Sequence, residues 1–254
     1  MAHPMPKPPA TPIAQPTLVP DQAYIIHIPG DGRRDRNVET LSKQLRAIGI
    51  PRVDVFDGIR PTDAGPMMSI GEWGCYQSHV ACLGLAASAP AGSSVMILED
   101  DAVLDVMPED LVRVLGRASA LDWDFLHVGY LDNGFFRSWD RSVGLDEFVE
   151  IKGALLGLQS YCVRPEGLAE RWEFMAALPD ASPLVGGAAG IDGAYCELAW
   201  RGPATSRWAP SRSLFRQIAG VKSNLRPSPL PQRAKEMVRS AVVDNKTVRR
   251  LAGR

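Results

Sequence analysis

The chain has 254 residues, of which 45% are hydrophobic and 22% charged, and its formal net charge is -1. This composition is typical of a globular protein with one large or two small domains, and the balanced charge argues against a nucleic-acid partner. No apolar run reaches about 18 residues, the length that marks a membrane-spanning helix, so we expect no membrane-spanning helix.

The two ends of the chain differ from its middle. Residues 1–22 form a Pro-rich stretch, with seven prolines in the first twenty positions, and we predict a disordered leader. Residues 226–254 carry eight Lys or Arg and two acids, a balance of +6. They predict a Pro-rich linker and a basic helix that either packs on the domain or lies on an anionic membrane surface. Residues 23–225 then form one domain, and we expect a cytoplasmic protein, with peripheral attachment at the inner face of the membrane left open.

Strands and helices alternate through this domain. The apolar periodicity predicts strands at 24–28, 53–56, 95–98, 125–128 and 155–163, and helices at 35–48, 72–87, 108–118, 165–178 and 192–200. Such alternation predicts an α/β fold, a three-layer α/β/α sandwich around a mainly parallel sheet. Residues 130–152 and 179–190 read as loops, the first suited to substrate contacts and the second to a mobile lid.

The third strand runs directly into three carboxylates. Val95 to Leu98 are apolar, and Glu99, Asp100 and Asp101 follow at once. Open α/β sheets bind ligands at the carboxyl ends of their strands, where His127 of the fourth strand is also expected. Adjacent carboxylates repel one another, so a divalent cation or basic groups should neutralise them. A solvated acidic turn is the alternative.

The loop after the first strand carries cations. Arg33, Arg34 and Arg36 follow Gly30 and Gly32, but neither a dinucleotide fingerprint nor a P-loop is present. A diphosphate bound without a glycine cradle needs another source of positive charge, and a metal ion would supply it. Exposed, solvated arginines are the alternative.

The cysteines do not form a metal-binding pattern. Cys75, His79 and Cys82 share one face of a predicted helix, but Cys75 and Cys82 lie roughly 10 Å apart along its axis, too far for one zinc ion. We predict that these two, with Cys162 and Cys196, are reduced, buried thiols.

Several segments follow one another in an order that is known from one enzyme family. The segments are Arg33-Arg34-Asp35-Arg36, Ile48-Gly49-Ile50, Val55-Phe56-Asp57-Gly58, Gly71 to His79, Ile97-Leu98-Glu99-Asp100-Asp101, Gly157 to Tyr161, Ile191-Asp192, and Pro210-Ser211 leading to Gln217. Over about residues 23–217 the chain resembles glycosyltransferase family 25, which includes bacterial lipopolysaccharide β-galactosyltransferases and collagen β-galactosyltransferases. Leu158 departs from the family, which more often has a hydroxyl residue there.

The resemblance implies a GT-A-like, Rossmann-type fold and a metal-dependent, inverting transfer of a hexose, galactose being the first expectation. It implies a UDP-sugar donor, Mn²⁺ or Mg²⁺ as cofactor, and a glycan acceptor such as lipopolysaccharide core, another surface oligosaccharide or a lipid-linked glycan. Two alternatives stay open. They are a metal-dependent phosphohydrolase or nucleotidyltransferase, and a degenerate, non-catalytic domain that binds sugar nucleotides.

The resemblance also implies roles for residues. Asp101, with Glu99, is the expected ligand of the metal ion on the diphosphate, and Glu99 or Asp100 is also placed to hold the ribose or a metal-bound water. Asp192 is the expected catalytic base, with a helix N-cap as the alternative. The residues expected to bind the nucleotide sugar are Arg33, Arg36, Ser78, His79, Glu99, Asp100, Gln159, Tyr161 and Gln217.

Overall fold

The computed structural model describes residues 19–131, 145, 147–153, 155–185 and 190–218. The predicted basic helix, the linker and the leader up to residue 18 lie outside these ranges. None of the described helices is long and apolar enough to cross a membrane.

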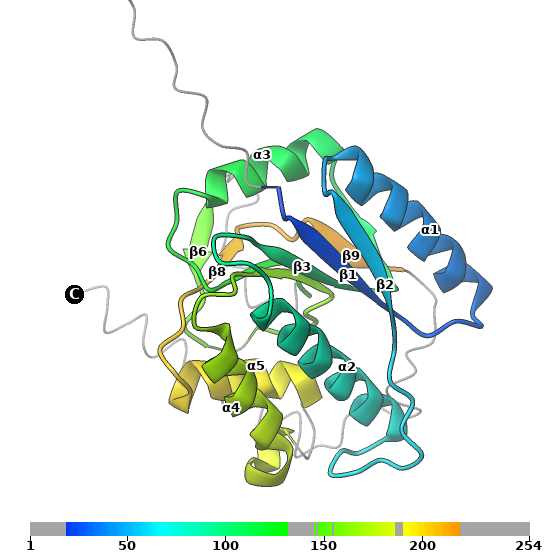
Figure 1. Ribbon diagram of the computed structural model, residues 1–254, viewed down its shortest axis with the longest axis vertical. Helices are drawn as coiled ribbons and strands as arrows, with labels where there is room; N and C mark the ends of the chain where they lie inside the picture. Colours follow the sequence, from blue (N-terminus) through cyan, green and yellow to red (C-terminus); the bar gives the residue numbers. More distant parts are fainter. Residues whose placement is uncertain (1–18, 132–144, 146, 154, 186–189, 219–254) are drawn as a thin grey trace, which may run out of the picture.

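One sheet of nine strands forms the centre of the molecule (Figure 1). The strands are β1 (Gln22–His27), β2 (Arg52–Asp57), β3 (Val95–Glu99), β4 (Ala102–Leu104), β5 (Phe125–Gly129), β6 (Phe148–Glu150), β7 (Ser160–Val163), β8 (Arg207–Pro210) and β9 (Phe215–Gln217). Their order along the main path is β2-β1-β3-β7-β5-β8-β6, and β4 pairs with β9 beside it.

The strand directions make this a mixed, mainly parallel sheet. β1 is parallel to β2 and β3, and β5 is parallel to β8 and β9. β7 is antiparallel to both β3 and β5, so β3 and β5 themselves share a direction. The carboxyl ends of β1, β3 and β5 therefore meet at the edge where β7 begins.

Helices cover both faces of the sheet (Figure 1). α1 (Gly32–Ala47) and α3 (Pro108–Ala118) contribute buried residues to one core cluster, and α2 (Ile70–Ala87), α4 (Leu168–Ala181) and α5 (Gly190–Arg201) contribute to the other. These layers and directions confirm the predicted three-layer α/β sandwich of GT-A-like, Rossmann-type architecture.

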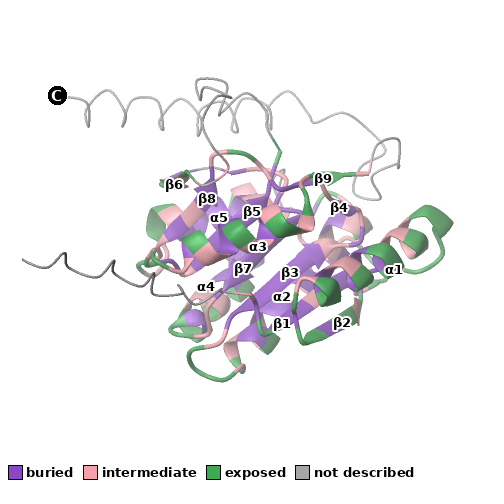
Figure 2. Cartoon of the chain, turned by 90° about the horizontal axis from the view of Figure 1, so that it is seen from above, coloured by how far each residue is buried: buried purple, intermediate pink, exposed green. Residues whose placement is uncertain are grey.

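The side chains of β3 show how the sheet joins the two cores. Val95 and Ile97 belong to the cluster under α2, whereas Met96 and Leu98 belong to the cluster under α1. All four are at most 1% exposed, and the central strands are the most buried part of the chain (Figure 2). Burial on both faces explains why this strand reads as a continuous apolar run.

Local sequence signals set the helix ends. Asp31 is the N-cap of α1 and accepts from the backbone N–H groups of Arg33 and Arg34, and Ser69 caps α2 in the same way. Gly49, just after the C-cap of α1, has φ +99°, a conformation that glycine adopts without strain, as predicted for this position.

Other predicted boundaries were wrong. The strand predicted at 155–163 is only Ser160–Val163, and α4 begins at Leu168 and continues through Pro179 into the predicted lid. β1 begins at Gln22, one residue inside the predicted leader. The unpredicted strands β4, β6, β8 and β9 have three or four residues each, too few to show a period.

Gly74 allows α2 to approach the preceding loop. A Cβ atom at this position would lie 2.5 Å from the carbonyl oxygen of Ile59 and 3.0 Å from Pro61. The obstacle is backbone, which cannot swing aside as a flexible side chain can. Gly74 thus lets the first turns of α2 pack closely against the loop that follows β2.

We expect Gly74→Ala to lower the free energy of unfolding by about 1–3 kcal/mol, because the added methyl group overpacks this contact. The matched control is Gly32→Ala, whose Cβ meets only the flexible end of Arg36 at 3.5 Å. It should be neutral or stabilising by up to about 1 kcal/mol, since alanine favours a helix. Chemical denaturation of both variants tests this, and equal effects would contradict it.

Candidate active site

The candidate site lies where β1 and β3 end. The strands are parallel neighbours with Ile26 opposite Glu99, so His27 and the acidic triplet emerge at the same edge. Glu99 ends β3, and Asp100 and Asp101 form the turn before β4. The carboxylates therefore lie at the carboxyl edge of the sheet, where the sequence placed them.

Asp100 is the most enclosed of the three carboxylates, with 3% of its surface exposed. Its Oδ1 accepts from Arg34 Nη1 at 2.5 Å. Its Oδ2 lies 2.9 Å from His27 Nδ1 and 3.2 Å from the backbone nitrogen of Ile28. These internal donors occupy both oxygens, so the Asp100 side chain positions the loop between β1 and α1 and is not free to contact a nucleotide.

α1 holds the acidic turn through two side chains. Arg34 Nη2 also lies 3.3 Å from Asp101 Oδ2. Asn37 Nδ2 donates to the carbonyl oxygens of Asp100 at 2.9 Å and Ala102 at 2.7 Å. Both the carboxylates and the backbone of the turn are therefore attached to this helix.

The arginine that reaches the site is not one of the two selected from the sequence. Arg33 and Arg36 are exposed, whereas Arg34 is partly buried. Arg34 lies in one stripe of α1 with the buried Val38 and Leu41, at spacings of four and seven residues. That spacing is visible in the sequence and could have identified Arg34 as the inward-facing cation.

Asp101 keeps one carboxylate oxygen without a partner. Oδ1 is buried and makes no hydrogen bond among the described residues. Burial raises the pKa of Asp101 to about 7, the charge of Glu99 adds to this, and the charge of Arg34 opposes it. A divalent cation would reverse this electrostatic cost and use the unpartnered oxygen.

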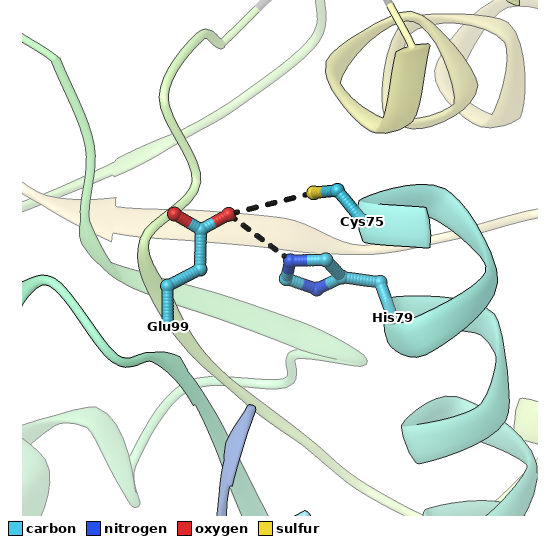
Figure 3. A group of neighbouring side chains, drawn as sticks. All are labelled: Cys75, His79 and Glu99. Carbon is cyan, nitrogen blue, oxygen red and sulfur yellow. Dashed lines mark hydrogen bonds and ion pairs between the residues drawn. The ribbon is translucent and has the colours of Figure 1, made fainter. Parts of the chain in front are cut away.

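Glu99 turns to the opposite side, toward α2 (Figure 3). Its Oε1 lies 3.2 Å from His79 Nε2 and 3.8 Å from Cys75 Sγ, and His79 Nδ1 lies 3.0 Å from the hydroxyl of Tyr161. Burial raises the pKa of Glu99, but the hydrogen bond and charge of His79, with the charge of Arg34, outweigh it and leave that pKa below the ordinary value. Glu99 is thus held as a carboxylate.

Asp192 reaches this region from α5. It lies inside the first helical turn, not at the N-cap position, and its Oδ2 accepts from the backbone N–H of Gly157 at 2.9 Å. Burial raises its pKa to about 6, the Gly157 hydrogen bond opposes this, and the charge of Glu99 adds to it. A carboxylate with a pKa near neutral pH suits a general base.

The remaining predicted residues have different surroundings. Ser78 is buried, donates to the carbonyl of Gly74 at 2.6 Å and accepts from the backbone of Ile59 at 2.9 Å. Gln159 is buried, and its Nε2 donates to the carbonyl of Phe215 at 3.2 Å. Tyr161 is buried beneath His79, and Gln217 is exposed on β9. Of this group, only Gln217 offers an exposed side chain to a ligand.

His127 does not reach the cleft. It is fully buried, and its Nε2 accepts from Arg207 Nε at 3.3 Å. Burial lowers the pKa of His127 well below its ordinary value, and the charge of Arg207 adds to this effect. The expectation that His127 reaches the cleft is therefore wrong, because its ring belongs to the core.

The site as a whole carries an excess of negative charge. Glu99, Asp100, Asp101 and Asp192 contribute four carboxylates, and Arg34 is the guanidinium that pairs with two of them. Carboxylate oxygens are the ligands that Mg²⁺ and Mn²⁺ prefer. Asp101 offers its unpartnered oxygen to such a cation, whereas Glu99 would have to turn away from His79 to serve as a second ligand.

Comparison with known proteins adds a likeness in shape. No family model and no curated protein matches the sequence. Among solved structures, the chain is similar to a glycosyltransferase involved in the glycosylation of the major capsid of PBCV-1. The identity is 10%, the likeness covers 80% of this chain and 94% of that one, and the TM-score is 0.48. The functional argument therefore depends on the side chains described above.

We expect Asp100→Asn to lower the free energy of unfolding by about 2–3 kcal/mol, because it weakens charged hydrogen bonds to Arg34 and His27 in a buried place. Asp57→Asn is the matched control, since Asp57 is 80% exposed in its ion pair with Arg60. That change should cost less than about 1 kcal/mol. Urea denaturation measures both, and a similar loss in the two variants would contradict the anchoring role of Asp100.

A second prediction concerns Asp192. Its folded pKa is raised to about 6 from an ordinary 3.8, so its contribution to stability is fully present below about pH 4 and is lost as pH rises through about 6. Asp192→Asn removes this dependence. In metal-free protein, the stability of the variant relative to wild type should rise between about pH 4 and 6 and then level off. A pH-independent difference in denaturation experiments would refute the raised pKa.

Proposed function

We propose that this chain is a metal-dependent, inverting glycosyltransferase that moves a hexose from a UDP-sugar to a glycan acceptor. The observation that carries the proposal is the buried, unpartnered Oδ1 of Asp101 within a group of carboxylates at the carboxyl edge of the sheet. A sugar donor brings a diphosphate, whose charge the carboxylates would repel unless a cation lies between them.

In this proposal Asp101 holds Mn²⁺ or Mg²⁺, and Glu99 turns from His79 to supply a second oxygen ligand. The bound ion would act as a Lewis acid that stabilises the negative charge of the departing diphosphate. Arg34 contributes in a different way, because its two nitrogens keep the Asp100 and Asp101 carboxylates in position.

Asp192 is the proposed base. Inversion requires one in-line displacement, in which the acceptor hydroxyl loses its proton on the face opposite the leaving group. Asp192 comes from α5, whereas Asp101 follows β3, so the two carboxylates are supplied by separate elements. The Gly157 N–H holds one Asp192 oxygen and thereby orients the carboxylate.

The exposed side chains of Arg33, Arg36 and Gln217 are the proposed contacts to the nucleotide sugar. Ser78, Gln159, Tyr161 and Asp100 are enclosed, so we assign them the positioning of the loops and strands that carry the site. His79 also belongs to this group through its contacts with Glu99 and Tyr161. Galactose as the sugar and a lipopolysaccharide or lipid-linked acceptor follow from the resemblance to glycosyltransferase family 25.

We expect Asp101→Asn to lower metal-dependent turnover of a UDP-hexose by roughly a hundredfold or more, because the charge that holds the ion is lost. The control is Asp105→Asn, which should retain activity because Asp105 is an exposed carboxylate that forms an ion pair with Arg216. The assay incubates each protein with UDP-galactose, UDP-glucose and Mn²⁺ and identifies the products.

Release of UDP and free sugar, or transfer to an added glycan, supports the proposal. Cleavage within the diphosphate would instead indicate a phosphohydrolase or nucleotidyltransferase. Metal-dependent binding of UDP without any turnover would indicate a non-catalytic domain. Full activity of a folded Asp101→Asn variant would overturn the metal assignment.

A further inference from the structure

A second group of potential metal ligands lies on the α2 side of the acidic triplet. Cys75 and His79 are four residues apart on one face of α2, and Glu99 reaches them from the end of β3 (Figure 3). The Cys75 Sγ, one ring nitrogen of His79 and one Glu99 oxygen all lie within 4.8 Å of one another. Three chemically different donors therefore converge on one point.

The spacing of these atoms fits one small cation. Bonds of about 2.0–2.3 Å at tetrahedral angles place ligand atoms about 3.3–3.8 Å apart. The Glu99 Oε1 lies 3.2 Å from His79 Nε2 and 3.8 Å from Cys75 Sγ. An ion could be bound with only small movements of these side chains.

The chemistry of the donors selects a different ion from the one proposed at Asp101. Thiolate and imidazole favour zinc and other late transition metals, whereas a site built from carboxylates alone favours Mg²⁺ or Mn²⁺. Cys75 as thiolate and Glu99 as carboxylate would together balance the charge of Zn²⁺. Three protein ligands leave a fourth position open for water or another ligand.

Two surrounding features support this assignment. The hydroxyl of Tyr161 lies 3.0 Å from His79 Nδ1, so its oxygen can accept a hydrogen bond from Nδ1–H and leave Nε2 to bind a metal. Cys75 is only partly buried, whereas Cys82 on the same helix is completely enclosed in the core and makes no part of the group. In the metal-free protein burial raises the pKa of Cys75, and the charges of Glu99 and Asp192 add to this. A bound cation would instead favour the thiolate.

We propose that Cys75, His79 and Glu99 form a zinc-binding site beside the proposed cation site at Asp101, with which it shares Glu99. The inference does not depend on the proposed transferase activity, because it concerns metal binding by the protein without nucleotide. Glu99 is common to both sites, so occupation of the zinc site would draw Glu99 away from Asp101.

The test is titration of the metal-free, reduced full-length chain with Co²⁺ and then Zn²⁺. Cobalt should bind with a thiolate-to-metal charge-transfer absorption and visible bands typical of tetrahedral geometry, and zinc should displace it. Cys75→Ser should abolish the charge-transfer band and lower zinc affinity by about a hundredfold or more. This loss exceeds the roughly 10–100-fold that is typical when a residue that only hydrogen-bonds to a metal ligand is replaced. Cys82→Ala, on the same helix, should retain both the band and the affinity.

Further variants separate this site from the proposed catalytic metal. Asp101→Asn should keep zinc binding even where it abolishes turnover of the sugar nucleotide, so either proposal can fail alone. Glu99→Gln should weaken zinc binding, and its charge-transfer band should still appear, at a higher cobalt concentration than in the wild type. Circular dichroism and thermal unfolding confirm that each variant folds. A charge-transfer band that survives in Cys75→Ser, or no cobalt binding by folded wild type, would overturn the proposal.

Discussion

The buried ion pair between Arg34 and Asp100 is the constraint on which the candidate site depends. It joins α1 to the turn after β3. His27 and Ile28, at the end of β1, also lie within hydrogen-bond distance of the Asp100 carboxylate. Removing one partner of such a pair leaves an uncompensated charge in a poorly solvated place, which is costly. The loop between β1 and α1 and the acidic turn are thus held as one unit.

The alternation of side chains along β3 then separates the functions of the three carboxylates. Leu98 belongs to the core under α1, so Glu99 turns toward α2 and Asp100 turns back toward α1. Asp101, beyond the strand, retains a free oxygen in the turn. The three adjacent acids therefore have different partners: Arg34 and His27 hold Asp100, His79 holds Glu99, and Arg34 holds one oxygen of Asp101.

The sequence predicted the parts of this arrangement that depend on local pattern. α1, α2, α3 and β3 follow from apolar periodicity and capping residues, and the position of the acidic triplet follows from the end of a buried strand. The direction of β7 relative to its neighbours could not be predicted in this way, because a run of four buried residues fits a parallel and an antiparallel strand equally well. The pairing of β4 with β9 joins residues more than a hundred positions apart, which no local pattern records.

The side-chain partners of the site were harder to predict for a related reason. Cys75 and His79 were considered with Cys82 as zinc ligands, and the helical rise excludes that set. Glu99 takes the place of Cys82, because β3 ends beside the amino half of α2, and this contact exists only in the folded chain.

Asp192 brings the last element to the same place, and it does so through a loop. Its carboxylate accepts from the backbone of Gly157, which has φ +66°, and a Cβ there would lie 2.1 Å from Leu131. Glycine is therefore required at this position on both steric and conformational grounds. The neighbouring Leu158 is 3% exposed within the core, so an apolar residue serves where the resemblance leads one to expect a hydroxyl. The loop thus aligns Asp192 through its backbone, and the side chain at position 158 is left to stabilise the sheet on which the acidic triplet ends.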